Sequence, residues 1–226
     1  MIGVFDSGIG GIAALSELKE IYPDADLIYL ADREHAPYGT KSSAELITCV
    51  GRCIDRLCRA GADRILIACC TASTVYENLP LWQREITTPI ISAAANIAAT
   101  LTKSKHISVI ATDMTVASHA FSRAILKVDP EITVREHPLQ SLVGMVESGV
   151  RDGNVTKKQK EKIKDLILGS VDGDTDTLIL GCTHFSHLEM TVGDVLGEGV
   201  RIVNAAREGA RAIPKPRSGS GVIRYL

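Results

Sequence analysis

The sequence predicts an α/β fold with mostly parallel sheets, and three observations lead to this prediction. Short apolar runs that end in a small or polar residue recur along the chain, with helical patterns between them. Two of these runs, at 65–71 and 178–184, share one order: an apolar strand, a small residue, and then a cysteine near a threonine. The chain has 226 residues, of which 45% are hydrophobic and 23% charged, so its length and composition suit one large or two small globular domains.

Strands are expected where an apolar run of four to six residues meets a turn signal. Continuous apolar runs, rather than alternating ones, are typical of parallel strands that are covered by helices on both faces. In chain order the expected strands are 2–5, 26–30, 64–68, 89–92, 106–111, 133–136, 177–180, 201–203 and 221–225.

Helices should fill most of the intervals between these strands. Residues 44–59 and 157–168 carry apolar side chains at a spacing close to 3.6 residues, which predicts two amphipathic helices that cover a sheet. Segments 149–156 and 215–220 are rich in Gly, Pro or Ser and are expected to be loops.

Charge and hydropathy exclude several classes of partner. Twenty-five Lys and Arg residues against 27 Asp and Glu give a net charge of −2, which offers no electrostatic footprint for nucleic acid or an anionic membrane. No apolar run approaches the roughly 18 residues of a membrane span, and Asp6 interrupts the first apolar run before a signal peptide could form. We therefore expect a cytoplasmic protein that binds neither nucleic acid nor membranes.

The six cysteines fall into two groups: Cys49, Cys53 and Cys58, and then Cys69, Cys70 and Cys182, which follow predicted strands. There is no C-x-x-C pair, and six cysteines are too few and too unevenly spread for a disulfide framework, so neither a disulfide network nor a metal site is expected. Cys49, Cys53 and Cys58 are interpreted as small buried hydrophobic residues. The adjacent pair Cys69 and Cys70 leaves a thiol redox protein as an alternative, disfavoured because neighbouring cysteines form only strained disulfides.

The N-terminal glycine-rich loop has three interpretations. Gly8, Gly10 and Ala13 satisfy a loose G-x-G-x-x-G/A pattern, and Asp32 follows about 20 residues later, as in dinucleotide-binding folds. Against this, Asp6 places a carboxylate where a pyrophosphate would have to bind. The glycines would then serve a tight turn, or the loop would hold a smaller anion such as a carboxylate.

Cys69 and Cys182 are the strongest candidates for chemistry. Each follows a strand, at the sheet edge where parallel folds bind ligands, and each would sit at a helix N-terminus that lowers the pKa of a thiol. Thr183 and His184 follow the second cysteine, so a Cys–His pair for acyl transfer is one interpretation. Two thiols in matching positions instead suggest two bases that act on opposite faces of one carbon.

Four sequence blocks, taken together, resemble the glutamate racemase family. They occur in the family's order and at similar spacing, and weaker echoes, including Glu147 and Asn204, extend the resemblance through nearly the whole chain. The blocks are VFDSGIGG at 4–11, PYGTKS at 37–42, ACCTAS at 68–73 and GCTH at 181–184.

The resemblance implies a racemase that needs no cofactor and has two pseudo-symmetric α/β lobes with the active site between them. We expect residues 1–95 and 207–226 to form the first lobe and 96–206 the second. The resemblance assigns Cys69, assisted by Asp6, as the base for one enantiomer, and Cys182, assisted by His184 and Glu147, as the base for the other.

The same resemblance implies how the substrate is bound and used. Glutamate would be the small-molecule substrate, its D-enantiomer would supply peptidoglycan synthesis, and the family often forms homodimers. Short side chains and backbone N–H groups would hold the substrate's charged groups and stabilise the carbanion-like transition state. The matching positions are Asp6, Ser7, Tyr38, Gly39, Cys70, Thr71, Thr183 and His184.

Two alternatives and three departures from the family pattern accompany this prediction. An aspartate racemase is the closest alternative, because a difference of one methylene is worth only about 1–3 kcal/mol in a pocket. A carboxylate-binding protein without activity is the other. Cys70 stands where the family usually has Asn, segment 32–36 places extra charges near the expected cleft, and the chain ends at Leu226, where relatives continue into a last helix.

Overall fold

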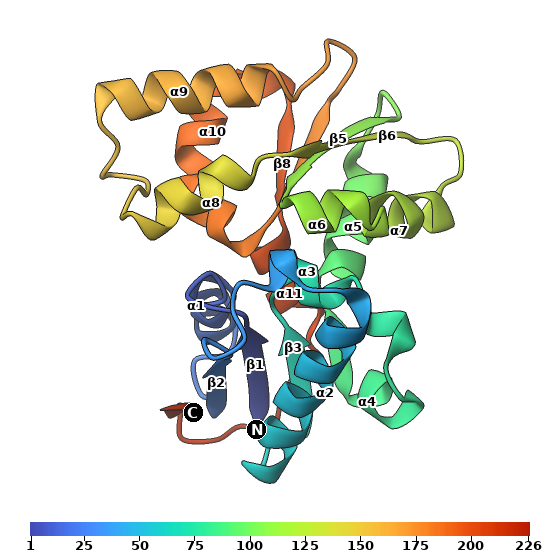
Figure 1. Cartoon of the computed structure of the whole chain (residues 1–226), viewed down its shortest axis with the longest axis vertical. Helices are drawn as coiled ribbons and strands as arrows, with labels where there is room; N and C mark the ends of the chain where they lie inside the picture. Colours follow the sequence, from blue (N-terminus) through green and yellow to red (C-terminus); the bar gives the residue numbers. More distant parts are fainter.

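Two parallel sheets, each flanked by helices, form the computed structural model of this chain, which describes residues 1–226 (Figure 1). The first sheet has the strand order β4-β3-β1-β2-β9, and all its neighbouring strands are parallel. Its strands are β1 (Ile2–Asp6), β2 (Leu27–Ala31), β3 (Arg64–Ile67), β4 (Thr87–Pro89) and β9 (Ile223–Tyr225).

The second sheet has the order β6-β5-β7-β8, again with parallel neighbours only. Its strands are β5 (His106–Ala111), β6 (Thr133–Pro138), β7 (Thr177–Gly181) and β8 (Arg201–Asn204). The predicted α/β class with mostly parallel sheets is thus confirmed.

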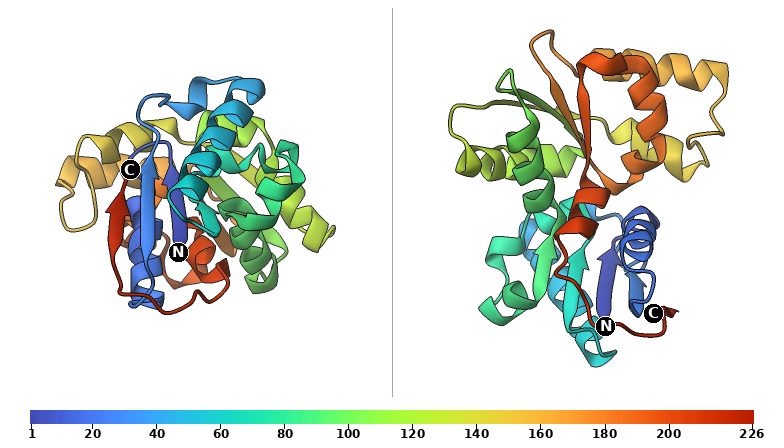
Figure 2. Two further views of the ribbon diagram at one scale, coloured as in Figure 1. Left: turned by 90° about the horizontal axis from the view of Figure 1, so that it is seen from below. Right: turned by 180° about the vertical axis from the view of Figure 1, so that it is seen from behind.

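Helices cover both sheets and also connect them. Figure 2 shows α5 and α11 running between the two sheets, so the chain passes from the first lobe to the second and back through helices. The predicted lobe boundaries, at 95/96 and 206/207, fall inside these two helices, and that division stays a prediction. The helices are α1 (Ile12–Ile21), α2 (Ser43–Arg59), α3 (Cys70–Ser73), α4 (Leu81–Ile86), α5 (Ile90–Leu101), α6 (Asp113–Ala117), α7 (Ala120–Val128), α8 (Gln140–Glu147), α9 (Lys157–Leu168), α10 (Glu189–Leu196) and α11 (Ala205–Ala212), with 3₁₀ helices at Tyr38–Thr40, Tyr76–Asn78, Thr183–Leu188 and Gly197–Gly199.

The two predicted amphipathic helices are α2 and α9, and their observed ends lie within one residue of the predicted ones. Local capping signals determine where both helices begin. Ser42 caps α2 by accepting from the N–H of Glu45, whose carboxylate accepts from the N–H of Ser42 in return. Thr156 and Gln159 form the same capping box at the start of α9.

One predicted strand is misplaced. Residues 89–92 were expected as a strand, but β4 ends at Pro89 and Ile90 begins α5. The β-branched pair Ile90 and Ile91 favours a strand locally, whereas in the fold both side chains are buried in the core as the first turn of the connecting helix. Tertiary packing therefore overrides local propensity here.

A single apolar cluster continues from one lobe into the other. Ala94 and Ala98 of α5 lie in the same cluster as Val4 of β1, Val109 of β5 and Ala206 of α11. The connecting helices are therefore part of the core rather than flexible linkers.

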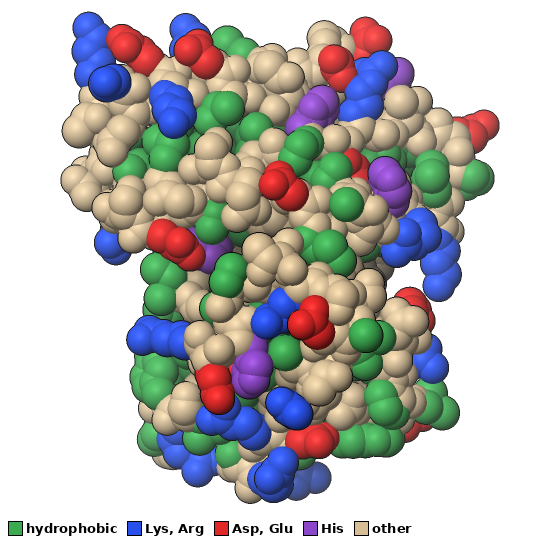
Figure 3. All heavy atoms as spheres, in the orientation of Figure 1, with side chains coloured by type: hydrophobic (Ala, Val, Ile, Leu, Met, Phe, Trp, Pro, Cys, Tyr) green, Lys and Arg blue, Asp and Glu red, His purple; other side chains and the backbone are tan.

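Side chains of both signs are interspersed over the face seen in Figure 3, in line with the small net charge. None of the helices is both long enough and apolar enough to cross a bilayer.

Candidate active site

The carboxyl ends of the strands in both sheets meet at a cavity of about 100 Å³ between the lobes. Asp6 ends β1, and the two candidate cysteines follow β3 and β7. Neither Lys nor Arg lines this cavity. The lining residues are Ser7, Gly8, Ala36, Pro37, Tyr38, Gly39, Cys69, Cys70, Thr71, Thr112, Gln140, Val143, Glu147, Cys182, Thr183 and His184.

Asp6 is fully buried beside the cavity and contacts both lobes. Its Oδ1 accepts a hydrogen bond from the N–H of Gly8 at 2.8 Å, and its Oδ2 accepts from the hydroxyl of Thr183 at 3.1 Å. Burial raises the pKa of the Asp6 carboxyl, and nearby His184 partly opposes that shift. The carboxyl therefore lies between the two cysteine segments, and burial increases its affinity for a proton.

Cys69 is held by the short helix that follows it. Its Sγ accepts from the N–H of Ala72 at 3.5 Å and lies 3.6 Å from the hydroxyl oxygen of Ser7. Burial, followed by the negative charge of Asp6, raises the pKa of Cys69 to about 11. The expected lowering by a helix N-terminus is thus wrong, because α3 has only four residues and desolvation outweighs its dipole.

Cys182 faces a histidine that is itself paired with a carboxylate. The Sγ of Cys182 lies 3.7 Å from Nδ1 of His184, and Nε2 of His184 lies 3.5 Å from a carboxylate oxygen of Glu147. Burial raises the pKa of the Cys182 thiol as well. The imidazole therefore stands between the thiol and the carboxylate, although its Nε2 makes no hydrogen bond in this structure.

Gly10 allows the two lobes to approach each other at the site. A β-carbon at this position would lie 2.5 Å from Oγ1 of Thr183 and 2.8 Å from Nδ1 of His184. On the opposite side, the hydroxyl of Thr71 lies 3.2 Å from those of Thr112 and Thr115 in the second lobe. The glycine-rich loop thus serves contact between the lobes in addition to a tight turn.

Tyr38, Gly39 and Cys70 also line the cavity. The hydroxyl of Tyr38 donates to Oδ2 of Asp32 at 2.6 Å, so this group already has an acceptor within the first lobe. Cys70 is buried, and desolvation together with the other two thiols holds its pKa well above the usual range. Burial therefore favours the protonated form of all three thiols around the cavity.

Neither Arg33 nor Glu34 of segment 32–36 lines the cavity, although Ala36 of the same segment does. The same segment instead brings ligand atoms of Asp32, His35 and Cys49 within 4.8 Å of one another. The oxygens of Asp32 are already hydrogen-bonded to His35 at 2.9 Å and to Tyr38, which accounts for this cluster without an ion.

Several lining residues were missed from the sequence. Gln140 and Val143 lie three residues apart on α8, and Glu147 follows four residues later, so all three share one helix face. Since Glu147 was a candidate, helical spacing counted backwards from it would have predicted Val143 and Gln140 on the same face. Gly8 and Pro37, which also line the cavity, lie within the blocks at 4–11 and 37–42, whereas Ala36 adjoins the second block and Thr112 lies outside all four.

A larger cavity of about 540 Å³ lies elsewhere between the lobes, with Tyr76, Glu77, Arg123 and Lys127 in its lining. It contains none of the predicted site residues. The smaller cavity is the better candidate active site, because the paired thiols, histidine and carboxyls converge there.

Glutamate racemases are among the known proteins that this chain resembles over most of its length. A glutamate racemase from Geobacter metallireducens is 32% identical over 226 residues, which cover 99% of this chain and 82% of that protein. The crystal structure of a glutamate racemase from Bacillus anthracis matches with a TM-score of 0.83 at 31% identity, over 93% of this chain and 79% of that one. The glutamate racemase from Francisella tularensis, solved in complex with D-glutamate, matches with a TM-score of 0.81 at 27% identity, over 99% and 86% of the two chains.

The model of one protein family, described as Asp/Glu/hydantoin racemase, matches residues 13–213. This stretch includes both cysteine segments, the histidine that follows the second one, and both helices that connect the lobes. The chain therefore belongs to the Asp/Glu/hydantoin racemase family.

Proposed function

We propose that this protein is a glutamate racemase that interconverts L- and D-glutamate with two thiols and no cofactor. The observation that carries the proposal is the placement of Cys69 and Cys182, which follow matching strands of the two sheets and line one cavity. A racemase needs one group to remove the α-proton and another to return a proton to the opposite face, and this pair supplies both.

Each half of the reaction is a proton transfer at the α-carbon. One cysteine, as thiolate, takes the α-proton and becomes a thiol, and the electron pair left on the carbon is shared with the adjacent carboxylate. The other cysteine, as thiol, donates its proton to the opposite face and becomes a thiolate. The reverse reaction exchanges the two roles, so no group is consumed.

The raised pKa values of the thiols explain why substrate would trigger the chemistry. Burial favours the protonated form of both thiols. The substrate's α-ammonium would bring a positive charge beside them, and a nearby cation favours the thiolate. Asp6 beside Cys69, and His184 with Glu147 beside Cys182, would accept the displaced proton.

Neutral groups would bind the substrate's carboxylates, because no Lys or Arg lines the cavity. The hydroxyls of Ser7, Thr71 and Thr183 and the backbone around Tyr38 and Gly39 are the available donors. Fixed donors of this kind stabilise charge that develops on the α-carboxylate in the transition state. We place the reaction in the cytoplasm, where D-glutamate would serve peptidoglycan synthesis.

Circular dichroism of the purified protein with L-glutamate, and separately with L-aspartate, tests this function without any added cofactor. We expect the signal of L-glutamate to decay to zero as the racemic mixture forms. Decay with L-aspartate alone would reassign the substrate. No decay with either amino acid, from a folded sample, would contradict racemase activity and favour a carboxylate-binding protein. The double variant C69S/C182S is the matched blank.

A further inference from the structure

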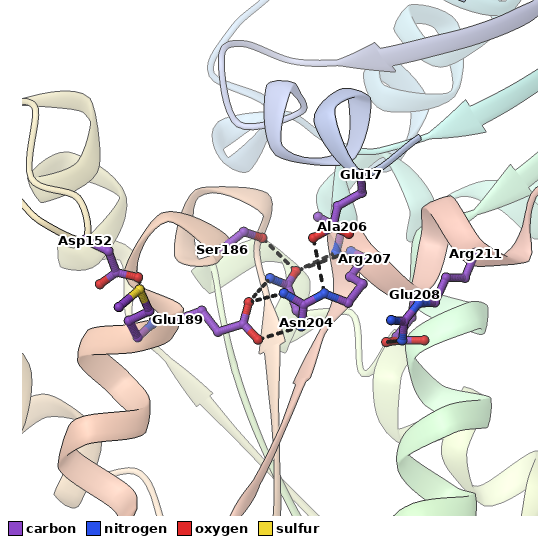
Figure 4. Close-up of polar contacts among 10 residues, drawn as sticks. Glu17, Asp152, Ser186, Glu189, Asn204, Ala206, Arg207, Glu208 and Arg211 are labelled. Atoms are coloured by element: carbon purple, nitrogen blue, oxygen red, sulfur yellow. Dashed lines mark hydrogen bonds and ion pairs between the residues drawn. The ribbon is translucent and has the colours of Figure 1, made fainter. Parts of the chain in front are cut away.

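Arg207 forms an ion-pair network that joins the two lobes (Figure 4). Its two terminal nitrogens donate to the two carboxylate oxygens of Glu189 at 2.8 and 2.9 Å, and its Nε donates to Glu17 at 3.2 Å. Glu17 belongs to α1 in the first lobe and Glu189 begins α10 in the second, while Arg207 lies on the connecting helix α11. One guanidinium therefore bridges three elements.

The two bridged helices are the ones that follow the catalytic segments. α1 begins directly after the loop that runs from Asp6 to Gly11, the loop whose Ser7 hydroxyl meets Cys69. α10 begins directly after the 3₁₀ helix Thr183–Leu188, which starts at the residue after Cys182. A displacement between α1 and α10 would therefore displace the two halves of the active site relative to each other.

Asn204 makes the network rigid on the side of the second lobe. Its Nδ2 donates to Glu189 at 2.7 Å, and its Oδ1 accepts from the hydroxyl of Ser186 at 2.8 Å. The same oxygen caps α11 by accepting from the N–H groups of Ala206 and Arg207. The carboxylate that faces Arg207 is thus fixed by a second donor, and Asn204 also joins this network to Ser186, on the segment that carries His184.

The two-bond contact between Arg207 and Glu189 can hold both side chains in a defined relative position. A fork of two parallel N–H···O bonds fixes both distance and angle, unlike a single contact between flexible side chains. The three side chains are also only partly exposed, at 32% for Arg207, 24% for Glu17 and 22% for Glu189.

We propose that Arg207 is a positioning residue for racemisation, which holds the two lobes in the register that lets Cys69 and Cys182 reach one α-carbon at the same time. Arg207 does not line the cavity and touches no reacting atom. The inference rests on the proposed function, and it concerns the step that needs both thiols. Removal of the α-proton requires one thiol, whereas inversion requires the second at the correct distance.

This difference gives a readout that a purely structural role would not change. In D₂O, a thiol that removes the α-proton and returns a deuteron to the same face exchanges the hydrogen without inversion. If the lobes lose register, exchange continues while inversion slows. The ratio of deuterium uptake into L-glutamate to formation of D-glutamate should then rise.

The experiment compares initial rates for the wild type and Arg207→Gln, with the enantiomers separated and deuterium measured by mass spectrometry. We expect inversion to fall by about tenfold to a hundredfold, since a misplacement of about 1 Å costs rate on that scale, and the exchange ratio to rise by about as much. Arg207→Lys keeps the charge but loses the fork, so it should give an intermediate ratio. Glu189→Gln should behave like Arg207→Gln.

Arg211→Gln is the matched control. Arg211 lies on the same helix, and its guanidinium pairs at 3.0 Å with Glu208 of that helix rather than across the lobes (Figure 4). Its exchange ratio should equal that of the wild type. Thermal unfolding of each variant confirms that the fold is retained, and Arg207→Lys serves as the test if Arg207→Gln does not fold.

If the exchange ratio of Arg207→Gln equals that of the wild type, whether or not both rates fall, the positioning role is overturned and the proposed racemase function is unaffected. A wild type that neither inverts nor exchanges glutamate would instead refute the proposed function.

Discussion

Replacing Cys69 or Cys182 with serine is expected to lower the rate of glutamate racemisation by about 10³-fold, within the range that general acid–base catalysis contributes. A serine hydroxyl occupies nearly the same space as a thiol, so the fold should persist. It is, however, a far weaker acid than a thiol and does not ionise near neutral pH. Initial rates from L- and from D-glutamate, followed by circular dichroism, measure the loss in both directions.

Each single variant keeps one thiol, which sharpens the test. Exchange of the α-hydrogen with D₂O should survive for one enantiomer only, and the two variants should retain exchange of opposite enantiomers. Cys58→Ser, the same substitution at a half-buried position of α2 outside the cavity, should leave both rates unchanged. Normal turnover in either Cys69→Ser or Cys182→Ser would rule out a two-thiol mechanism.

Replacing Asp6 with asparagine is expected to slow racemisation by about 10²-fold. The amide can still accept from the N–H of Gly8 through its oxygen, while the hydroxyl of Thr183 can accept from the new NH₂ group instead of donating. The shape of the site is thus retained, but the group that exchanges protons beside Cys69 is lost. The rate should fall more for the enantiomer that Cys69 deprotonates.

Stability separates this effect from misfolding. Burial raises the pKa of Asp6, which means that the folded state disfavours its charged form, and a neutral amide avoids that cost. The midpoint of thermal unfolding for Asp6→Asn should therefore equal or exceed that of the wild type. Asp63→Asn, a change of an exposed carboxylate in the same lobe, is the control for activity. Full activity in Asp6→Asn would show that this carboxyl has no part in proton transfer.

The sheets and the cysteine positions could be predicted from sequence because they depend on local order. A buried parallel strand is a continuous apolar run, and the residue after it lies at the sheet edge whatever the rest of the chain does. Cys69 and Cys182 were found in this way. The strand expected at 89–92 failed because Ile90 and Ile91 gain more from packing in the core as a helix than from their local preference.

Features that depend on contacts between distant segments could not be predicted. The pKa of Cys69 was expected to be low, yet it follows from burial between two lobes, which no local pattern reports. The sequence left Gly10 in a loop for dinucleotide binding, a tight turn or a small anion, and no local pattern reported its approach to Thr183. Arg207 belongs to no recognisable motif. Its partners, Glu17 and Glu189, are far apart in the sequence, so no local pattern indicates that the three residues meet.

The most direct test of a two-thiol racemase is the reaction of the wild-type protein with L-glutamate in D₂O, without cofactor, followed at once by circular dichroism and mass spectrometry. The mechanism predicts that optical activity is lost and that each D-glutamate molecule formed carries deuterium at its α-carbon, because the returning proton comes from a thiol that exchanges with solvent. D-glutamate that retains the original hydrogen at that carbon would contradict the mechanism.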